Sequence, residues 1–273
     1  MNHFIEIGRC AEGRVWVTIH SGSRQFGSKV AGYWQDVAAK KSTEKRHVGM
    51  IKNVIRIKET FHRSKWSKEI TKAREKYVTV TKGLEYLEDE DMFGYLIDMV
   101  FTQTYAEESR KLMKELVIDA LTLPRNRSGY DYIPYCKMYD YEHIACSHNY
   151  IDFKDFIIRK GAISAYKDEL MIIPFNMEDG TLICKGKGNP EWNYSAPHGA
   201  GRPMSRTDAK RKAKKEGYLQ KAKVRMEEKG MFASKLPADE LRESYKDPKM
   251  IEDAIGPTAE IIRKIIPIIA MKD

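Results

Sequence analysis

The chain has 273 residues, of which 42% are hydrophobic and 32% are charged. This balance is typical of a folded globular protein and excludes a disordered chain. The formal net charge of +9 at pH 7 suits a polyanionic partner such as a nucleic acid or the phosphates of a nucleotide.

The first predicted elements lie on either side of a turn of small residues. Residues 15–20 are apolar and β-branched, so they predict a short buried strand. The small residues at 21–27 predict a turn that leads into a helix near 28–40. The polar, basic region at about 40–83 has weak periodicity, and we predict surface structure or an insertion there.

The middle of the chain carries the clearest periodic pattern. Apolar side chains recur every three or four positions over residues 94–121 and predict a long helix that a Leu-Pro pair terminates. Two short apolar segments follow at 170–173 and 181–184. The Asp-Gly turn before the second segment predicts a β-hairpin.

The last third of the chain begins with a glycine-rich stretch. A polar helix is predicted at about 205–229, and a final helix over 250–266 that ends before a proline. We find no internal repeat, low-complexity tract or linker. The sequence therefore predicts one α+β domain with mixed sheets.

Neither the cysteines nor the apolar segments indicate secretion. The four cysteines are Cys10, Cys136, Cys146 and Cys184. They form no C-x-x-C pair, and their spacing fits no zinc knuckle. The first residues show no secretory signal, and the longest apolar run, 265–271, is too short to cross a bilayer. We expect a cytoplasmic chain with reduced thiols and no membrane contact.

Four of the seven histidines have neighbours that suit a binding pocket. They are His3, His20, His148 and His198. His20 ends an apolar strand before Ser-Gly-Ser-Arg, and His198 precedes Gly-Ala-Gly-Arg. Small neighbours let a ligand approach the backbone closely. A single histidine is more often a hydrogen-bonded structural residue, so spacing alone leaves both a metal site and a structural role open.

The stretch around His198 also suits an anion. Uncovered backbone N–H groups, a helix N-terminus and two arginines four residues apart, Arg202 and Arg206, would together bind a phosphate on one helix face. An unhindered imidazole beside a phosphate is a candidate nucleophile. A glycine-rich turn that leads into a solvated basic helix explains the same pattern.

Four segments resemble the motifs of one family, in the same order. They are Asn2-His3-Phe4-Ile5-Glu6, Ile19-His20-Ser21-Gly22-Ser23-Arg24, Ser147-His148-Asn149, and the stretch from Gly186 through His198-Gly199-Ala200-Gly201-Arg202 to Arg206. The family is RtcB, the GTP-dependent RNA ligases that join 3′-phosphate or 2′,3′-cyclic phosphate ends to 5′-hydroxyl ends. The final Met-Lys-Asp is similar to the family's terminal lysine motif. The resemblance implies a single ligase domain over residues 1–273, with mixed or antiparallel sheets and flanking helices.

The resemblance also implies a role for each matching residue. His198 would be the catalytic nucleophile that takes GMP from GTP and passes it to the RNA 3′-phosphate. His3, His20 and His148 would bind manganese, with two Mn2+ ions expected. The residues expected to contact the nucleotide are Asn2, His3, Phe4, Ile5, Glu6, His148, Asn149, Pro174, Phe175, Asn176, Met177, Thr181, Gly199, Ala200, Gly201, Arg202, Arg206, Tyr245 and Lys272.

The chain departs from the family pattern at its start. The family carries a segment before the Asn-His-Phe motif, and an Asp-x-x-Cys motif in that segment supplies two more metal ligands. No Asp-x-x-Cys occurs in this sequence. Three explanations stay open: a truncated reading frame, a split ligase that pairs with an upstream half-protein, or a copy that binds nucleotide or RNA without ligating. The expected partners are RNA with the ends named above, such as tRNA, and an archease-like activator.

Overall fold

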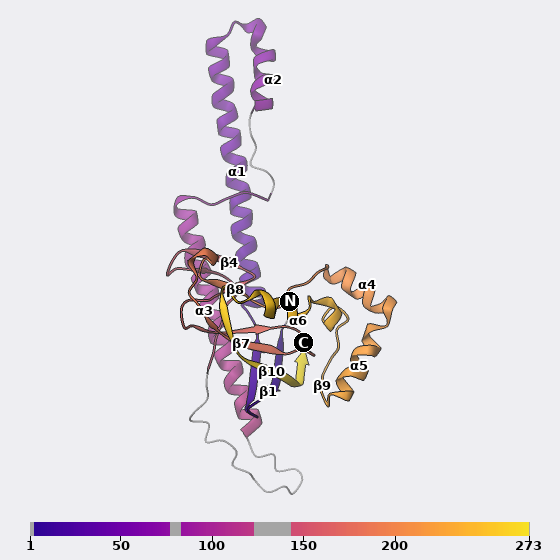
Figure 1. The fold of residues 1–273 in the computed structure, drawn as a ribbon. Helices are drawn as coiled ribbons and strands as arrows, with labels where there is room; N and C mark the ends of the chain where they lie inside the picture. Colours follow the sequence, from indigo (N-terminus) through magenta and orange to yellow (C-terminus); the bar gives the residue numbers. More distant parts are fainter. Residues whose placement is uncertain (1–2, 77–82, 123–142, 273) are drawn as a thin grey trace. The chain divides into compact units, whose positions relative to one another are not determined.

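The structure, a computed structural model, describes residues 3–76, 83–122 and 143–272 (Figure 1). Its α-helices are α1 (Arg24–Thr60), α2 (Trp66–Lys76), α3 (Asp89–Thr122), α4 (Arg206–Glu216), α5 (Tyr218–Glu228) and α6 (Pro248–Ala254). Its strands are β1 (Phe4–Arg9), β2 (Val15–His20), β3 (Asn149–Asp152), β4 (Ile157–Lys160), β5 (Ala162–Ser164), β6 (Leu170–Pro174), β7 (Thr181–Gly186), β8 (Ser195–Pro197), β9 (Phe232–Ala233) and β10 (Ala259–Lys272). Short 3₁₀ helices are η1 (Arg63–Lys65), η2 (Pro190–Trp192) and η3 (Arg242–Ser244). The predicted α+β class is confirmed.

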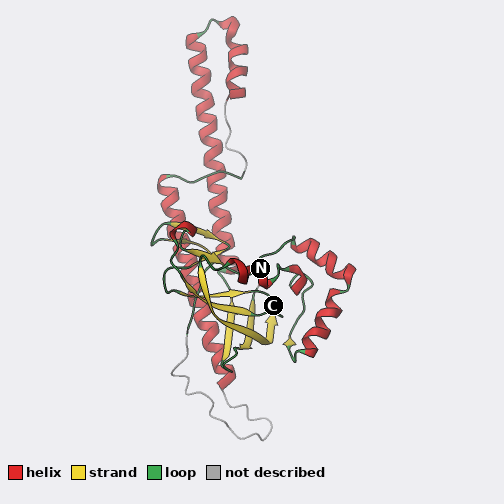
Figure 2. Ribbon diagram, in the orientation of Figure 1, coloured by secondary structure: helices red, strands yellow, loops and turns green. Residues whose placement is uncertain are grey.

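The described chain divides into two compact units. The first unit combines residues 1–22 with 107–273, and the helical unit comprises residues 23–106. Every described strand belongs to the first unit (Figure 2). The prediction of one ligase domain over residues 1–273 rests on the resemblance and stays a prediction.

A six-stranded sheet forms the centre of the first unit. Its order is β2-β1-β10-β7-β6, and β9 pairs in addition with β10. The β9–β10 pair is parallel, and the other neighbours are antiparallel. The strand predicted at 15–20 corresponds to β2. Two small antiparallel sheets, β3–β4 and β5–β8, belong to the same unit.

The long strand β10 replaces a helix that the sequence predicts over 250–266, so that prediction is wrong. The helix α6 ends at Ala254, and Gly256-Pro257 breaks the pattern. The isoleucine-rich segment that follows is β-branched and finds hydrogen-bond partners in β1 and β7. Pro267 lies opposite Gly8 at a register shift in the β1–β10 pair. A bulge tolerates the missing N–H of a proline there.

The predicted β-hairpin is confirmed as β6–β7, with Pro174 paired to Thr181 at its end. Leu182, Ile183 and Cys184 are fully buried, and side chains of β6 alternate between buried and half-buried positions. The largest buried cluster therefore gathers on this hairpin and on the β5–β8 pair. Its members are Ile163, Ala165, Met171, Ile173, Phe175, Leu182, Cys184, Ala196, Ala200, Ile255 and Ala259.

The helical unit is built on two long helices and one short one. The helix predicted near 28–40 continues through the polar region as α1, and α2 packs back along it after η1 (Figure 1). Trp34 Nε1 donates a hydrogen bond to Asp98 of α3 at 2.9 Å. A Cβ at Gly94 would lie 2.5 Å from the Trp34 ring, so the glycine allows this close contact. Among the described helices, none is both long and apolar enough to cross a membrane.

The polar helix predicted at 205–229 is two helices, α4 and α5. Gly217 adopts φ +66° between them and ends α4 in the left-handed conformation that glycine tolerates. Ser205 caps α4, because its hydroxyl accepts the backbone N–H of Asp208. The helix predicted over 94–121 corresponds to α3.

Candidate active site

A row of rings forms the centre of the candidate site. The Phe4 and His20 rings stack with centroids 5.2 Å apart, because Phe4 of β1 lies directly opposite His20 of β2 in the antiparallel pair. The His148 ring stacks on His20 at 5.4 Å and lies 4.8 Å from the His198 ring. His148 directly precedes β3, His198 directly follows β8, and His3 precedes Phe4. Motif segments that are far apart in the sequence therefore meet here.

Burial keeps two of these imidazoles neutral. It lowers the pKa of His20 to about 4, and the neighbouring His148, His3 and His198 lower that pKa further. Burial and the nearby His198 also lower the pKa of His148. At neutral pH each ring therefore carries one proton and one lone pair, which is the form that binds a metal ion.

The hydrogen bond of His198 fixes its tautomer. His198 Nδ1 lies 2.5 Å from the carbonyl oxygen of Gly161, in the turn between β4 and β5. A carbonyl oxygen only accepts, so Nδ1 carries the proton and Nε2 carries the lone pair. The N–H of Gly161 donates to His148 O and to Asn149 Oδ1, each at 2.8 Å. One turn thus connects two of the motif segments.

A buried arginine holds the strand that leads into His198. Arg159 is 2% exposed and forms an ion pair with Asp152. Its Nε donates to Ser195 Oγ at 3.0 Å, and its guanidinium donates to Tyr194 O at 3.2 Å. Because Ser195 begins β8, these bonds set the path of the backbone up to the nucleophile candidate.

The three residues after His198 follow a tightly packed path. A Cβ at Gly199 would lie 2.8 Å from Pro174 O, so the backbone can pass the end of β6 only with glycine here. Ala200 is 2% exposed and belongs to the main core. Gly201 adopts φ +68°, and its carbonyl accepts the N–H of Lys246 at 3.1 Å.

A buried carboxylate gathers the basic side chains of the site. Glu240 is 4% exposed and lies 2.6 Å from Arg202, 3.0 Å from Arg206 and 3.1 Å from Lys272 Nζ. The hydroxyl of Tyr245 also donates to it. Burial alone would raise the pKa of Glu240, but the Tyr245 hydrogen bond and the Lys272 and Arg202 charges outweigh it and hold that pKa below its ordinary value. Burial likewise lowers the pKa of Lys272 and raises that of Tyr245.

The expected placement of the two arginines on one helix face is wrong, because α4 begins at Arg206 and Arg202 precedes it. The guanidiniums converge all the same, since both bind the Asp239-Glu240 pair. Arg206 lies 3.0 Å from Asp239 Oδ2, and Arg202 donates to the Asp239 carbonyl. The Arg202 guanidinium also stacks on the Tyr245 ring, with its carbon atom 4.4 Å from the ring centroid. The carboxylates therefore orient both guanidiniums.

Glu6 follows Phe4 by two residues in β1, at the Phe4 end of the row of rings. It is 4% exposed in β1, and Thr181 Oγ1 donates to it at 3.4 Å. Burial raises the pKa of Glu6 to about 7, although Thr181 and the charge of Lys272 act in the other direction. The Lys272 ammonium lies 5.2 Å from the centroid of Phe4, its partner in the β1–β10 register. Ile5 follows Phe4 within the same sheet.

The raised pKa of Glu6 predicts a pH-dependent stability. Between about pH 4.5 and 7 the unfolded chain loses the Glu6 proton while the folded chain retains it, so the free energy of unfolding falls as the pH rises. Above pH 7 this penalty is constant, at about 3 kcal/mol. Urea unfolding at pH 4.5 and pH 8 measures it, and Glu6→Gln removes it. An equal pH dependence in parent and variant would contradict a buried, protonated Glu6.

The turn of the β6–β7 hairpin is mostly buried. Pro174 ends β6, and Phe175 and Met177 are 3% and 5% exposed. The Asn176 side chain bonds within the turn, with its amide donating to Asp179 at 2.7 Å. The role of these residues in nucleotide contact stays a prediction. Asn2, which the resemblance also assigns to the nucleotide, lies outside the described residues.

The full length of the chain matches one family. A family model described as tRNA-splicing ligase RtcB covers residues 1–273. The chain belongs to the RtcB family. This confirms the resemblance that the histidine and glycine motifs carry.

Curated RtcB proteins from bacteria and a eukaryote are similar to the chain. The RNA-splicing ligase RtcB of Escherichia coli strain K12 is 28% identical over 278 residues, which cover 99% of this chain and 59% of that protein. RtcB1 of a second Escherichia coli strain is 29% identical with the same coverage. RtcB homolog 1 of Entamoeba histolytica is 23% identical over 308 residues, 99% of this chain and 53% of that protein. The chain thus spans less than three fifths of the length of these relatives.

The chemistry of the histidines fits the manganese that the RtcB resemblance implies. His20 and His148 are held neutral by burial, and His148 Nδ1 is buried with no hydrogen-bond partner among the described residues. The rings are stacked, however, and within the described residues no group of three or more His, Cys, Asp or Glu side chains has a metal-binding arrangement. The ligand role of His3, His20 and His148 stays a prediction.

Three residues of the site have no counterpart in the sequence analysis. Asp239 and Glu240 organise the basic side chains, and Gly161 sets the tautomer of His198. Their contacts with His198, Arg202, Arg206 and Lys272 join residues that are 32 to 38 positions apart.

Proposed function

We propose that the chain ligates RNA through a histidine-GMP intermediate, with GTP as the energy source. The observation that carries this proposal is the hydrogen bond from His198 Nδ1 to Gly161 O. It leaves the Nε2 lone pair available to attack phosphorus, which is the requirement for a neutral imidazole nucleophile. Family membership supports the same reaction class.

In the first proposed step, His198 Nε2 attacks the α-phosphorus of GTP. A phosphorus–nitrogen bond forms, the bond to the bridging oxygen of the β-phosphate breaks, and pyrophosphate leaves. Gly161 O stabilises the positive imidazolium as it develops, because it already accepts the Nδ1 proton. Arg202 and Arg206 lie in the same unit, oriented by Asp239 and Glu240, and would neutralise the phosphate charge.

In the later steps an RNA 3′-phosphate oxygen attacks the GMP phosphorus and His198 leaves. The RNA 5′-hydroxyl then attacks the activated 3′-phosphate, and GMP departs. We propose RNA with 3′-phosphate and 5′-hydroxyl ends, tRNA among them, as the substrate. The guanine base would lie against Phe4, with Glu6, Tyr245 and Lys272 as its polar contacts.

Manganese would be held by His3, His20 and His148 and would supply Lewis-acid neutralisation of the triphosphate. The neutral state of His20 and His148 supports this assignment. We place the reaction in the cytoplasm, where thiols such as the buried Cys10 and Cys184 and the half-buried Cys146 stay reduced.

Self-guanylylation tests the proposal. The full chain is incubated with Mn2+ and GTP labelled at the α-phosphate, beside His198→Ala and a control, His47→Ala, whose ring is exposed on α1. We expect acid-labile, alkali-stable label on the parent and the control, and none on His198→Ala. An unlabelled parent, or a labelled His198→Ala variant, would overturn the proposal.

A further inference from the structure

The positive charge of the chain is concentrated in one stretch of the helical unit. Residues 40–76 contain 13 Lys and Arg against four Asp and Glu, an excess of nine that equals the net charge of +9 of the whole chain. The remaining residues therefore carry equal numbers of basic and acidic side chains. This stretch covers the second half of α1, the turn η1 and α2. The candidate active site uses none of it.

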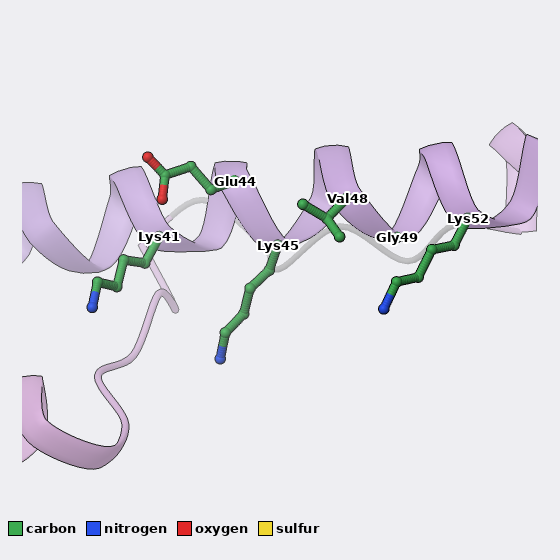
Figure 3. A pocket seen from close by; sticks show the side chains of 6 residues that line it. All are labelled: Lys41, Glu44, Lys45, Val48, Gly49 and Lys52. Atoms are coloured by element: carbon green, nitrogen blue, oxygen red, sulfur yellow. The ribbon is translucent and has the colours of Figure 1, made fainter.

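One face of α1 carries a row of basic side chains. Lys41, Lys45, Lys52 and Arg56 follow at intervals of four, seven and four residues, which places them on a single helix face. Figure 3 shows Lys41, Lys45 and Lys52 projecting from the same side of the helix, whereas Glu44, which lines the same pocket, projects from the other side. Residues 50, 54 and 57 lie about half a turn away and are half-buried or buried, so the basic row lies on the exposed face of α1.

The two ends of this row differ in their partners. Lys41 forms an ion pair with Asp91 and Lys45 with Glu88, so both lysines bind the region where α3 begins. Beyond them, seven exposed cations up to residue 74 have no ion-pair partner among the described residues. Lys58 is one of them, but its ammonium lies over the Trp66 ring, and Arg74 lies further along α2. The other five are Lys52, Arg56, Arg63, Lys65 and Lys68, called here the basic hairpin. Cations without an ion-pair partner therefore cluster at the η1 end of the α1–α2 hairpin.

The turn at this end is held in one conformation. Trp66 Nε1 donates to Phe61 O at 2.7 Å, and the Lys58 ammonium lies 5.6 Å from the centroid of the Trp66 ring. His62 Nδ1 accepts the N–H of Ser64. The backbone that presents the exposed cations of η1 is thus ordered before any partner binds, which lowers the entropic cost of binding.

We propose that the basic hairpin binds the phosphate backbone of double-stranded RNA, and this rests on the proposed function as an RNA ligase. Clustered, unpaired Lys and Arg are the residues that neutralise nucleic-acid phosphates. Binding of single strands usually adds several aromatic side chains on which successive bases stack. Of the phenyl and indole rings at this described turn, Trp66 is half-buried and hydrogen-bonded to Phe61 O, and Phe61 alone is exposed, at 39%. One exposed ring does not form such a stacking surface. A stem of the substrate RNA would therefore lie along α1 and η1.

Binding of a blocked duplex tests this proposal. The probe is a fluorescein-labelled RNA duplex of about 20 base pairs with 5′-phosphate and 3′-hydroxyl ends, which cannot be joined by the proposed chemistry. The full chain is compared with a variant that replaces Lys52, Arg56, Arg63, Lys65 and Lys68 by Gln. We expect the affinity at about 100 mM salt to fall at least tenfold, and the slope of log K against log salt to fall by up to ~4.5.

A matched variant removes the same charge elsewhere. It replaces five exposed lysines of α4, α5 and the residue that follows α5 by Gln, at Lys212, Lys214, Lys215, Lys223 and Lys229. This variant is expected to bind the duplex as the parent does. Equal weakening by both variants, or no weakening by the first, would overturn the proposal. So would a loss confined to single-stranded RNA.

Circular dichroism shows whether each variant is folded. If the variant with five substitutions does not fold, the double variant Arg63→Gln/Lys65→Gln, whose changes are confined to η1, takes its place. The slope of log K against log salt is expected to fall by up to ~2 for this variant.

The binding and labelling experiments distinguish failure of this proposal from failure of the proposed function. A parent that labels on His198 but does not bind the duplex overturns the role of the basic hairpin alone. A parent that binds the duplex through these residues but does not label overturns the ligase proposal and leaves RNA binding standing.

Discussion

Replacing Glu240 with alanine is expected to lower the free energy of unfolding by about 3–5 kcal/mol. The carboxylate is 4% exposed and binds Arg202, Arg206, Tyr245 and Lys272. The substitution would remove the carboxylate that lies 3.1 Å from the Lys272 ammonium, whose side chain is only 6% exposed. Leaving an uncompensated charge in a buried place costs more than the pair contributes when intact.

Urea unfolding of the full chain at pH 7 measures this loss. Glu240→Gln retains the shape and one hydrogen-bond acceptor but not the charge, so its loss should be smaller. The control is Glu228→Ala, which removes an exposed carboxylate at the end of α5 and is expected to change stability by less than ~0.5 kcal/mol. Equal unfolding curves for Glu240→Ala and Glu228→Ala would show that Glu240 does not hold the cluster together.

The elements that the sequence predicts correctly are those whose signals are local. The β6–β7 hairpin follows from two apolar segments around an Asp-Gly turn, and α3 follows from its apolar period. The break at Gly217 is also a local signal, since glycine favours the left-handed conformation at the end of a helix. It is missed because the basic side chains on both sides continue a single polar pattern.

The strand β10 could not be predicted in the same way. Its isoleucines suit either a buried helix or a strand, and the choice is made by partners far away in the sequence. Residues 266–272 pair with β1, and residues 259–265 pair with β7. Only the assembled sheet supplies the hydrogen bonds that favour the extended form.

The candidate site shows the same division. The four motif histidines could be selected from their sequence context, and the structure brings His20, His148 and His198 into one row of rings. The groups that orient the motif residues were not predictable, because Gly161 and Glu240 carry no chemistry that a short motif would reveal. Their importance lies in which side chains the fold brings to them.

The second large effect is expected at Gly199. Replacing it with alanine places a Cβ 2.8 Å from Pro174 O, closer than such atoms approach in folded proteins. Because the β6 backbone is fixed in the central sheet, the segment that carries His198 must move instead. A displacement of about 1 Å at a reacting atom costs on the order of 100-fold in rate. The rate of self-guanylylation is therefore expected to fall at least 100-fold, with a loss of stability of about 1–3 kcal/mol.

Single-turnover labelling with α-labelled GTP separates this displacement from unfolding. It is run at a temperature where circular dichroism shows the variant to be folded. Gly256→Ala is the control, since a Cβ there meets no atom within 4 Å, and it should label at the parental rate. A folded Gly199→Ala chain that labels as fast as Gly256→Ala would mean that the position of His198 does not depend on the close passage of this loop past Pro174. The carbonyl of Gly161 would then be the contact that sets the position of the nucleophile, because Gly161 directly precedes β5, the strand that pairs with β8, and holds His198 Nδ1.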